Sequence, residues 1–325
     1  MNKLYKTRRY IPEDYAVWND FVTNAKNATF LFHRDFMEYH SDRFVDYSLM
    51  VFDDSKLCAV VPANYHEGKV YSHLGLTYGG ITFMKGLKFS ESLRVYRSVL
   101  QFLTVNSIIC FVLKITPKMY CKEATDELDY LLFLTDASLI RSDLSIAIDQ
   151  SGISKIQSNR MEGVKKGRRS KLIIREDGGF KSFWHQLLIP NLEARYHSSP
   201  THSCEEIIKL SFLFPEQIRQ FNVYYKEKLV AGATVFATET VAHVQYISAN
   251  SQKQQLGSLD YLFHFLIKDV FADKQYFDFG TSSENSGRAV NKGLLYWKEC
   301  FGGKGHVHNS YEVRTEKYIM LDHVL

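Results

Sequence analysis

The stretch FNVYYKEKLVAGATVFATETVAHVQY, residues 221–246, continues directly into ISANSQKQQLGSLDYLFHFLIKDVF, residues 247–271. The first part places apolar runs between polar turns, which predicts three strands, and the second part is a polar loop that opens onto an apolar helix. A loop at a helix N-terminus presents unpaired backbone N–H groups and the positive end of the helix dipole, and both favour an anion. We therefore expect a phosphate or a similar group to bind at Gln254, Gln255, Leu256, Gly257 and Ser258.

An earlier stretch, YSLMVFDDSKLCAVVPANYHEGKVYSH at residues 47–73, has the same order of strand, charged turn, strand, polar turn and strand. Matching residues are 172 positions apart with no gap across either hairpin (229 − 57), as in the pairs Lys56/Lys228, Leu57/Leu229 and Ala59/Ala231. We therefore expect a duplicated fold, with one domain at 1–151 and a second at 152–325. Only the second copy continues into the loop at 252–259.

The composition is that of a folded chain with two cores. Its 325 residues are 45% hydrophobic and 23% charged, which suits two domains of about 150 residues and gives no sign of disorder. The longest apolar run, Ile108–Leu113, is far shorter than the roughly 20 residues that span a membrane. Five scattered cysteines without C-x-x-C spacing fit reduced thiols better than disulfides or zinc. We expect a cytoplasmic protein with no membrane span.

The order of predicted elements places a helix between the fourth and fifth strands of the second copy. Helices are expected at about residues 13–25, 34–40, 93–103, 126–134, 158–169, 180–196, 204–213, 257–271 and 291–301. Strands are expected at about residues 47–53, 57–65, 69–73, 108–115, 144–148, 172–175, 221–226, 229–237, 241–248 and 276–279. A helix that crosses between two strands implies a parallel pair, so we predict a mixed sheet in an α+β fold with local α/β character.

Several motifs resemble those of a known superfamily. The loop resembles the acyl-CoA-binding pattern Q/R-x-x-G-x-G/A of GNAT N-acyltransferases: Gln254 and Gly257 match, while Leu259 stands where the family prefers a small residue. The stretches FDFGTSSENSGRAVNKGLLYWKECFGG (277–303), SHLGLTYGG (72–80) and PTHSCEEI (200–207) resemble duplicated GNAT proteins related to Fem-type peptidoglycan aminoacyl transferases. This resemblance covers nearly the whole chain.

The resemblance implies two tandem GNAT-like folds packed around a groove. It also implies transfer from acyl-CoA, most simply acetyl-CoA, bound as a co-substrate by the second half, with no permanently bound cofactor. The acceptor would be an amine of a sugar, a nucleotide-linked sugar, an amino acid or a cell-envelope precursor. Some Fem enzymes carry a long helical hairpin and use aminoacyl-tRNA. This chain has no such insertion, so tRNA is a second candidate donor.

Three residues are candidates for catalysis. His243 lies on a predicted strand where it shares a face with Gln245 and Ile247, and it could deprotonate an attacking ammonium or be a structural histidine. Tyr246 is a candidate acid for a leaving thiolate. Lys298 is seven residues after Asn291 on the last predicted helix, and it could polarise a carbonyl, hold a phosphate, or cap the helix end. In Fem-type enzymes a lysine of this final motif lies in the substrate channel, which favours the functional interpretation.

Other residues are candidates for substrate binding. Five of the seven residues from Lys165 to Lys171 are basic, so they form either a solvated surface or an anion site. Asp278 lies within an aromatic strand, and it either faces a groove or pairs with a buried base. A flexible turn, residues 281–287, follows that strand. The full set of predicted substrate residues is His73, Tyr78, Gly79, Arg168, Arg169, His202, Asp278, Ser282 and Asn291.

The sequence leaves three functions open. They are an acyl-CoA-dependent N-acyltransferase, a Fem-type transferase that uses aminoacyl-tRNA, and a ligand-binding protein of the same fold that has lost catalysis, which Leu259 in the loop would suggest. The net charge of +4 is too small to require a nucleic acid, and we expect no DNA partner. No metal site is expected, because the twelve histidines lack ligand spacing, and no P-loop, Rossmann or G-x-S-x-G motif occurs.

Overall fold

A computed structural model describes residues 5–152 and 155–325, which form two compact units. Unit 1 consists of residues 1–143 and 307–325, and unit 2 consists of residues 144–306. The predicted boundary after residue 151 therefore differs from the observed one, which falls inside the strand β9 (Ser138–Asp149). The last residues also return to unit 1, because the strand β17 (Lys304–Arg314) pairs with β8 (Cys110–Lys114).

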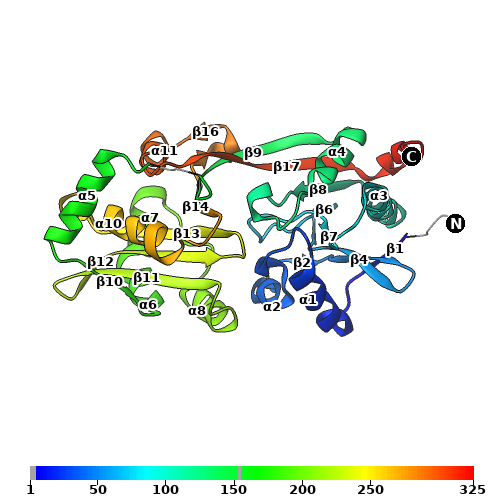
Figure 1. The fold of residues 1–325 in the computed structure, drawn as a ribbon. Helices are drawn as coiled ribbons and strands as arrows, with labels where there is room; N and C mark the ends of the chain where they lie inside the picture. The colour runs from blue at the N-terminus through cyan, green and yellow to red at the C-terminus, as the bar shows by residue number, and fades with distance from the viewer. Residues whose placement is uncertain (1–4, 153–154) are drawn as a thin grey trace. The chain divides into compact units, whose positions relative to one another are not determined.

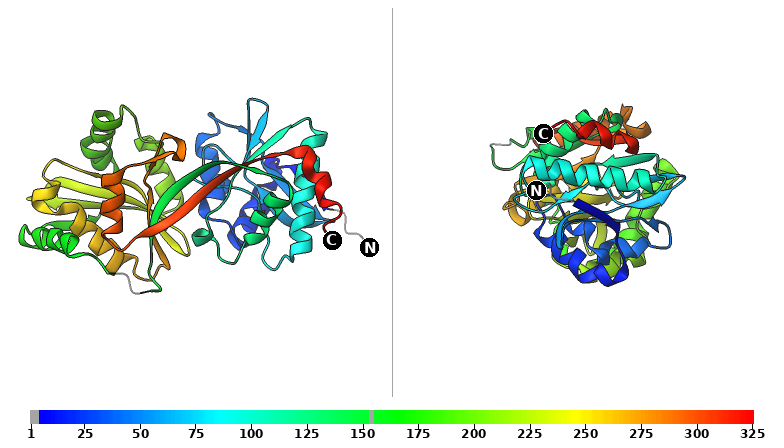
Figure 2. Two further views of the ribbon diagram at one scale, coloured as in Figure 1. Left: turned by 90° about the horizontal axis from the view of Figure 1, so that it is seen from above. Right: turned by 90° about the vertical axis from the view of Figure 1, so that its right-hand side faces the viewer.

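Unit 1 contains two sheets and a long covering helix. One sheet has the strand order β1-β3-β4-β7. The other has the order β17-β8-β6-β5-β2, and its strand β17 also pairs with β9. The strands are β1 (Tyr5–Arg9), β2 (Val45–Asp46), β3 (Leu49–Asp53), β4 (Lys56–Val61), β5 (Asn64–His66), β6 (Lys69–Tyr71) and β7 (Thr82–Phe83), besides β8, β17 and the start of β9. The helices are η1 (Pro12–Asp14), α1 (Tyr15–Asn24), η2 (Phe30–Phe32), α2 (Arg34–Met37), η3 (Glu38–His40), α3 (Phe89–Val105), η4 (Lys118–Tyr120), α4 (Asp126–Leu134) and η8 (Thr315–Leu321). Within this unit β9 and β17 lie side by side (Figure 2), and Ser142 bonds Asn309 at 2.7 Å.

Unit 2 contains one large sheet with helices on both faces (Figure 1), in the order β10-β11-β12-β13-β14-β9, and a separate two-stranded sheet. Its strands are β10 (Ile173–Glu176), β11 (Ile218–Tyr225), β12 (Lys228–Ala237), β13 (Val241–Ala249), β14 (Tyr276–Thr281) and the short pair β15 (Ser283–Glu284) and β16 (Ala289–Val290). Its helices are α5 (Ser158–Arg169), α6 (Phe180–Phe183), η5 (Trp184–Leu188), α7 (Ile189–Tyr196), α8 (Cys204–Leu213), α9 (Lys253–Leu256), α10 (Ser258–Phe265), η6 (Leu266–Val270), η7 (Asn285–Gly287) and α11 (Lys292–Glu299). The parallel pairing of β13 with β14 confirms the predicted mixed sheet.

The expected duplication is visible in two hairpins that agree residue by residue. In β3–β4, Phe52 is opposite Leu57 and Val51 is opposite Ala59, so that one residue of β4 is an extra residue in a bulge. In β11–β12, Tyr224 is opposite Leu229 and Val223 is opposite Ala231, with a bulge at the same place. Because every one of these positions is shifted by 172 (224 − 52), the repeat extends from the sequence to the register and to the bulge.

A second bulge changes which residues share a face of β13. Thr234 is opposite Tyr246 but Val235 is opposite Val244, so Gln245 is an extra residue. Side chains alternate between the two faces along a strand. The residues after the extra one therefore lie on the face opposite to the one that simple alternation predicts. Ile247 therefore packs against the same core as Ala242 and Val244, which also includes α10, and the predicted sharing of a face by His243, Gln245 and Ile247 is wrong beyond the bulge.

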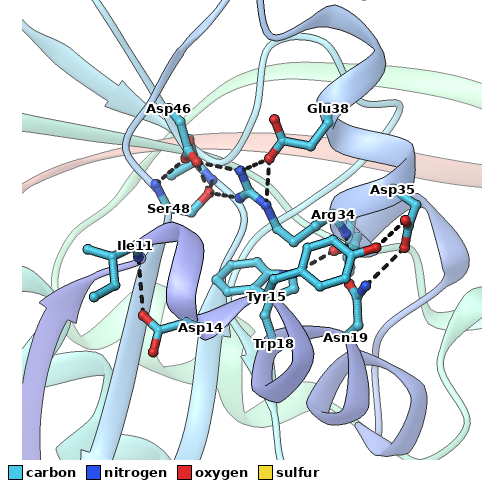
Figure 3. Close-up of polar contacts among 12 residues, drawn as sticks. Ile11, Asp14, Tyr15, Trp18, Asn19, Arg34, Asp35, Glu38, Asp46 and Ser48 are labelled. Atoms are coloured by element: carbon cyan, nitrogen blue, oxygen red, sulfur yellow. Dashed lines mark hydrogen bonds and ion pairs between the residues drawn. The ribbon is translucent and has the colours of Figure 1, made fainter.

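A buried arginine organises the start of unit 1 (Figure 3). The Arg34 guanidinium is 3% exposed, contacts the carboxylates of Glu38 and Asp46 at 2.5 Å each, and donates to Ser48 Oγ at 3.2 Å. It also lies 4.0 Å from the centre of the Tyr10 ring. A buried charge needs this many partners, since an uncompensated one costs several kcal/mol. The network therefore fixes α2 against β2 and against Ser48, the residue before β3.

Candidate functional site

The strands β13 and β14 part in the middle of unit 2. They pair in parallel from Val241 with Tyr276 to His243 with Asp278. Among the residues that the structure describes the pairing ends there, although β13 continues to Ala249 and β14 to Thr281. The bulge at Gln245 follows at once, and a bulge increases the local twist of a strand. The two strands therefore form a fork that opens towards their C-terminal ends, where open sheets commonly bind ligands.

A pocket of about 530 Å³ lies at the open end of β13. Its walls are residues 245–249 of β13, the helices α7 and α9, and the first turns of α10 and α11. Apolar side chains such as Leu192, Leu259 and Trp297 line it together with polar ones such as Asn191 and Gln245. A pocket of this size, mainly apolar with a few polar groups, is typical of a small-molecule site. All its lining residues belong to unit 2.

Positive charge predominates around the pocket. Lys253 of α9 and Arg195 of α7 line it, and burial together with the Arg195 charge lowers the pKa of Lys253. A third cation, Arg160 of α5, donates to Asp260 Oδ1 at 3.0 Å, and the Trp297 indole N–H donates to the same oxygen at 3.0 Å. Burial raises the pKa of Asp260, and these two donors partly oppose that shift. Since Asp260 is neutralised by Arg160, Lys253 and Arg195 leave the pocket suited to an anion.

The predicted anion-binding loop is mostly covered. Gln254 lines the pocket and Gln255 is exposed, but Leu256, Gly257 and Ser258 are buried. The Gly257 N–H donates to the Lys253 carbonyl at 2.9 Å instead of pointing at a ligand. Gly257 has a φ of +65°, and a Cβ placed on it would lie 2.1 Å from the Gly163 carbonyl oxygen of α5. The glycine therefore permits close contact between two helices, and of the five predicted loop residues only Gln254 reaches the pocket.

His243 and Asp278, which were predicted separately, form a pair at the base of the fork. His243 Nδ1 is 2.8 Å from Asp278 Oδ2, and Asp278 is fully buried. Asp278 Oδ1 accepts from Ser145 Oγ at 2.7 Å and from the Gly280 N–H at 2.8 Å. Of the two alternatives for Asp278, the structure shows the buried one, with a histidine as its partner.

Lys298 is tied to the backbone of β14. Its Nζ donates to the carbonyls of Gly280 at 2.8 Å and Thr281 at 2.7 Å, and the side chain is 3% exposed. Burial lowers the pKa of Lys298 to about 8, against the opposing effect of Asp278. A neutral amine still has two N–H bonds, enough for both carbonyls. Lys298 is not among the residues that line the pocket, so its predicted contact with a substrate would require it to leave these carbonyls.

We expect Lys298→Met to reduce the rise in folding stability between about pH 8 and pH 10.5. The folded-state pKa of about 8 is below the ordinary value of 10.5, so the unfolded chain binds more protons in this window and stability increases with pH. Without the lysine the increase should be smaller by about 1–3 kcal/mol, measured by urea unfolding at several pH values. The exposed neighbour Lys292, replaced by Met, should leave the wild-type slope, and an unchanged slope in Lys298→Met would contradict the shift.

Tyr246 and His202, also predicted separately, contact each other beside the pocket. The Tyr246 hydroxyl is 2.7 Å from His202 Nδ1 and accepts from the His202 N–H at 3.1 Å. Tyr246 lines the pocket, and burial raises its pKa. Asn291 also lines the pocket, where its side chain accepts from the Leu294 N–H and so caps α11. Ser282, the residue after β14, is buried, and its N–H donates to the Leu144 carbonyl.

The remaining predicted residues are not among those that line the pocket. His73, Tyr78 and Gly79 are in unit 1, where burial, and to a smaller extent the charge of the neighbouring His40, lowers the pKa of His73 to about 3. Tyr78 is buried and donates to Thr29 Oγ1 at 3.2 Å. Arg168 and Arg169 are exposed on α5. The structure therefore gives them no place in the unit 2 pocket.

Among the pocket residues that sequence reasoning missed are Arg160, Arg195, Lys253, Asp260 and Trp297. All five come from helices whose arrangement in space depends on tertiary contacts, above all the packing of α5 on α10. One signal was present in the sequence, because Gly163 and Gly167 are four residues apart in α5 and allow that close packing. Within the residues described, no cluster of three or more histidine, cysteine or acidic side chains could hold a metal ion. The described helices also include none that is long and apolar enough to cross a membrane.

Comparison with solved structures identifies the fold. FemX superimposes with a TM-score of 0.66 at 10% identity, over 98% of this chain and 99% of FemX. L-PGS from Bacillus licheniformis gives 0.56 at 11% identity over 97% and 96% of the two chains. A conserved protein of unknown function from Bacteroides thetaiotaomicron gives 0.59 at 9% identity, over 95% and 98%. No family model matches the sequence. No curated protein is similar to it either.

The chain therefore has a Fem-like fold. This confirms the fold expected from the motifs, including its mixed α/β class. At about 10% identity the likeness defines the architecture alone.

Proposed function

We propose that this protein is an N-acyltransferase that binds an acyl donor in the unit 2 pocket and transfers the acyl group directly to an amine. The fork between β13 and β14, together with the pocket at the open end of β13, is the observation that carries the proposal. In the part of the chain that the structure describes, the backbone N–H and C=O groups on the β14 side of β13 are not paired with β14 beyond His243. An extended donor chain could therefore form hydrogen bonds with them.

The transfer needs no covalent enzyme intermediate. The amine nitrogen forms a bond with the donor carbonyl carbon, and the C–S or C–O bond of the donor breaks with its electron pair on the leaving atom. The proton released by nitrogen passes to the leaving atom through a side chain of the site. Backbone N–H groups next to the bulge at Gln245 would stabilise the negative charge on the carbonyl oxygen, and the apolar walls would exclude water.

The first candidate donor is acyl-CoA, with acetyl-CoA as its simplest form. Lys253 and Arg195 provide two positive charges at the pocket, and the N-terminus of the eight-residue helix α10 adds its dipole. The phosphates of CoA would lie here, with the pantetheine arm along β13. The acceptor would be an amine of a sugar, a sugar nucleotide, an amino acid or a cell-envelope precursor, in keeping with the architecture shared with FemX.

A second candidate donor, aminoacyl-tRNA, is supported by the covered loop. Gly257 and Ser258 are buried under α5, so they offer no open nest for a pyrophosphate. α5 instead exposes a row of basic residues beside α9, and Lys166 Nζ donates to the Gln254 carbonyl at 3.2 Å. A basic surface next to a pocket suits an RNA whose acylated end enters the pocket.

Binding measurements separate the two donors. We expect acetyl-CoA to bind the purified protein with a Kd that changes little between about 50 and 200 mM salt. The Kd of a tRNA should change far more over the same range. If aminoacyl-tRNA is the donor, binding should weaken by a factor of roughly 1,000 or more over this range, because several phosphates are contacted. Calorimetry with acetyl-CoA and filter binding with charged tRNA give the two constants. Failure of both donors to bind would leave the ligand-binding protein without catalysis as the better description.

A further inference from the structure

His243 occupies the innermost position of the fork. It belongs to the last residue pair of the β13–β14 ladder, and the bulge at Gln245 follows two residues later. Its side chain is 13% exposed, while its partner Asp278 is fully buried. A donor chain that lay along β13 would end at this point. The reacting carbonyl would then be near His243.

The side chain of His243 lies on the same face of β13 as that of Tyr246, which lines the pocket, although His243 is not itself a lining residue. Its cross-strand partner is Phe236, whose ring is 6.0 Å from that of His202. His202 in turn contacts Tyr246, which lines the pocket. Directly opposite residues of an antiparallel pair share a face, so His243 and Tyr246 lie on the same face on the two sides of the bulge.

Asp278 is held in one orientation by donors from three segments. Ser145 Oγ of β9 and the Gly280 N–H of β14 both donate to Oδ1, which leaves Oδ2 for His243 Nδ1 at 2.8 Å. Gly280 adopts a φ of +74°, a backbone conformation that favours glycine at this turn. Its carbonyl is held by Lys298, the charged group of α11 that lies next to Asp278. The carboxylate therefore cannot turn away without breaking bonds to two other segments.

We propose that Asp278 is the positioning residue of a catalytic pair in which His243 is the general base, an inference that rests on the proposed acyl transfer. A carboxylate at Nδ1 requires that the imidazole proton be on that nitrogen, so the lone pair that accepts a proton is on Nε2. His243 Nε2 takes the proton from the attacking nitrogen as the C–N bond forms. It then gives this proton to the sulfur or oxygen that leaves the donor carbonyl. Atoms and charges balance without any other reactant.

The pair gives Lys298 a role different from the predicted contact with substrate. By holding the carbonyls of Gly280 and Thr281, Lys298 fixes the turn whose N–H orients Asp278. Ser145 of β9, which no sequence pattern selects, donates to Asp278 directly. The network therefore extends from α11 through β14 to the base of the fork, and each contact in it restricts the orientation of one imidazole ring.

The experiment combines the tautomer of His243 with the kinetics of Asp278→Asn. Two-bond ¹⁵N–¹H spectra of labelled protein, assigned with His243→Gln, should show the proton on Nδ1 in the wild type. In Asp278→Asn the amide can donate to Nδ1, so the proton should move to Nε2. Turnover with acetyl-CoA or aminoacyl-tRNA, whichever the wild type uses, and hydroxylamine as the acceptor should fall about 100-fold, with the donor KM within threefold.

Asp269→Asn is the matched control, because it makes the same change of side chain and charge at an exposed position of η6 that neither lines the pocket nor contacts the pair. In this variant the His243 tautomer should be unchanged and turnover should be within tenfold of the wild type. A wild-type proton on Nε2, or turnover of Asp278→Asn within tenfold of the wild type, overturns the proposal. If Asp278→Asn does not fold, His243→Gln decides the kinetic question, with the same tenfold limit. If neither donor is turned over by the wild type but the proton is on Nδ1, the acyl-transfer function fails and the geometry of the pair stands.

Discussion

Reversing both pocket cations, Arg195→Glu with Lys253→Glu, should weaken binding of the donor by about 1,000-fold or more. Each cation can make a charge-assisted contact worth about 1.5–3 kcal/mol, and each glutamate adds repulsion, so a loss of about 4 kcal/mol or more is expected. Both side chains line the pocket, and neither is part of an ion pair among the described contacts. The fold should therefore survive. Calorimetric titration with acetyl-CoA measures the loss.

The control for this variant is Arg168→Glu with Arg169→Glu, which changes the net charge by the same amount on exposed positions of α5. If the donor is a CoA thioester, the control should bind it within threefold of the wild type. If the donor is tRNA, both double variants should weaken binding and both should reduce its salt dependence. Normal donor binding by the pocket variant would remove the pocket from the proposed function.

Local patterns in the sequence were enough to predict most of the architecture. The hairpin containing Lys228 and Leu229 has a turn, an alternation and a repeat partner, and all three are short-range features that a single sequence displays. The helices at 158–169 and 204–213 were predicted with the bounds that the structure shows. β17 was missed because its residues KGHVHNSYEVR have weak alternation. They become a strand by pairing with β8, almost 200 residues earlier in the chain.

The candidate site was less predictable, because its parts meet through tertiary contacts. His243 and Asp278 were both selected, yet their pairing depends on the parallel register of β13 and β14, which no local pattern specifies. The bulge at Gln245 likewise follows no local pattern, and it places Ile247 on the opposite face of β13 from the one expected. Lys298 has the sequence context of a pocket residue but turns towards β14. Its orientation is decided by two carbonyls that needed a donor.

Gly257→Ala should lower the free energy of unfolding by about 3–5 kcal/mol, which is an unusually large effect for one added methyl group. The φ of +65° costs a residue with a side chain about 1–2 kcal/mol, and the new Cβ would lie 2.1 Å from the Gly163 carbonyl oxygen. That oxygen is backbone of α5, so relief requires moving α5 away from α10. Proline at this position would be worse, since its φ near −65° cannot match.

Such a shift would also disturb the pocket, because the α5 residue Arg160 neutralises Asp260 on α10. Donor binding should therefore weaken in Gly257→Ala even at temperatures where the protein is folded. The matched control is Gly293→Ala in the first turn of α11, where the nearest atom to a new Cβ is Asn291 Oδ1 at 3.7 Å. There the change should be neutral or stabilise the protein by up to about 1 kcal/mol, as alanine favours a helix over glycine. Urea unfolding of both variants gives the comparison, and equal stabilities would show that the contact between α5 and α10 is not close enough to exclude a methyl group.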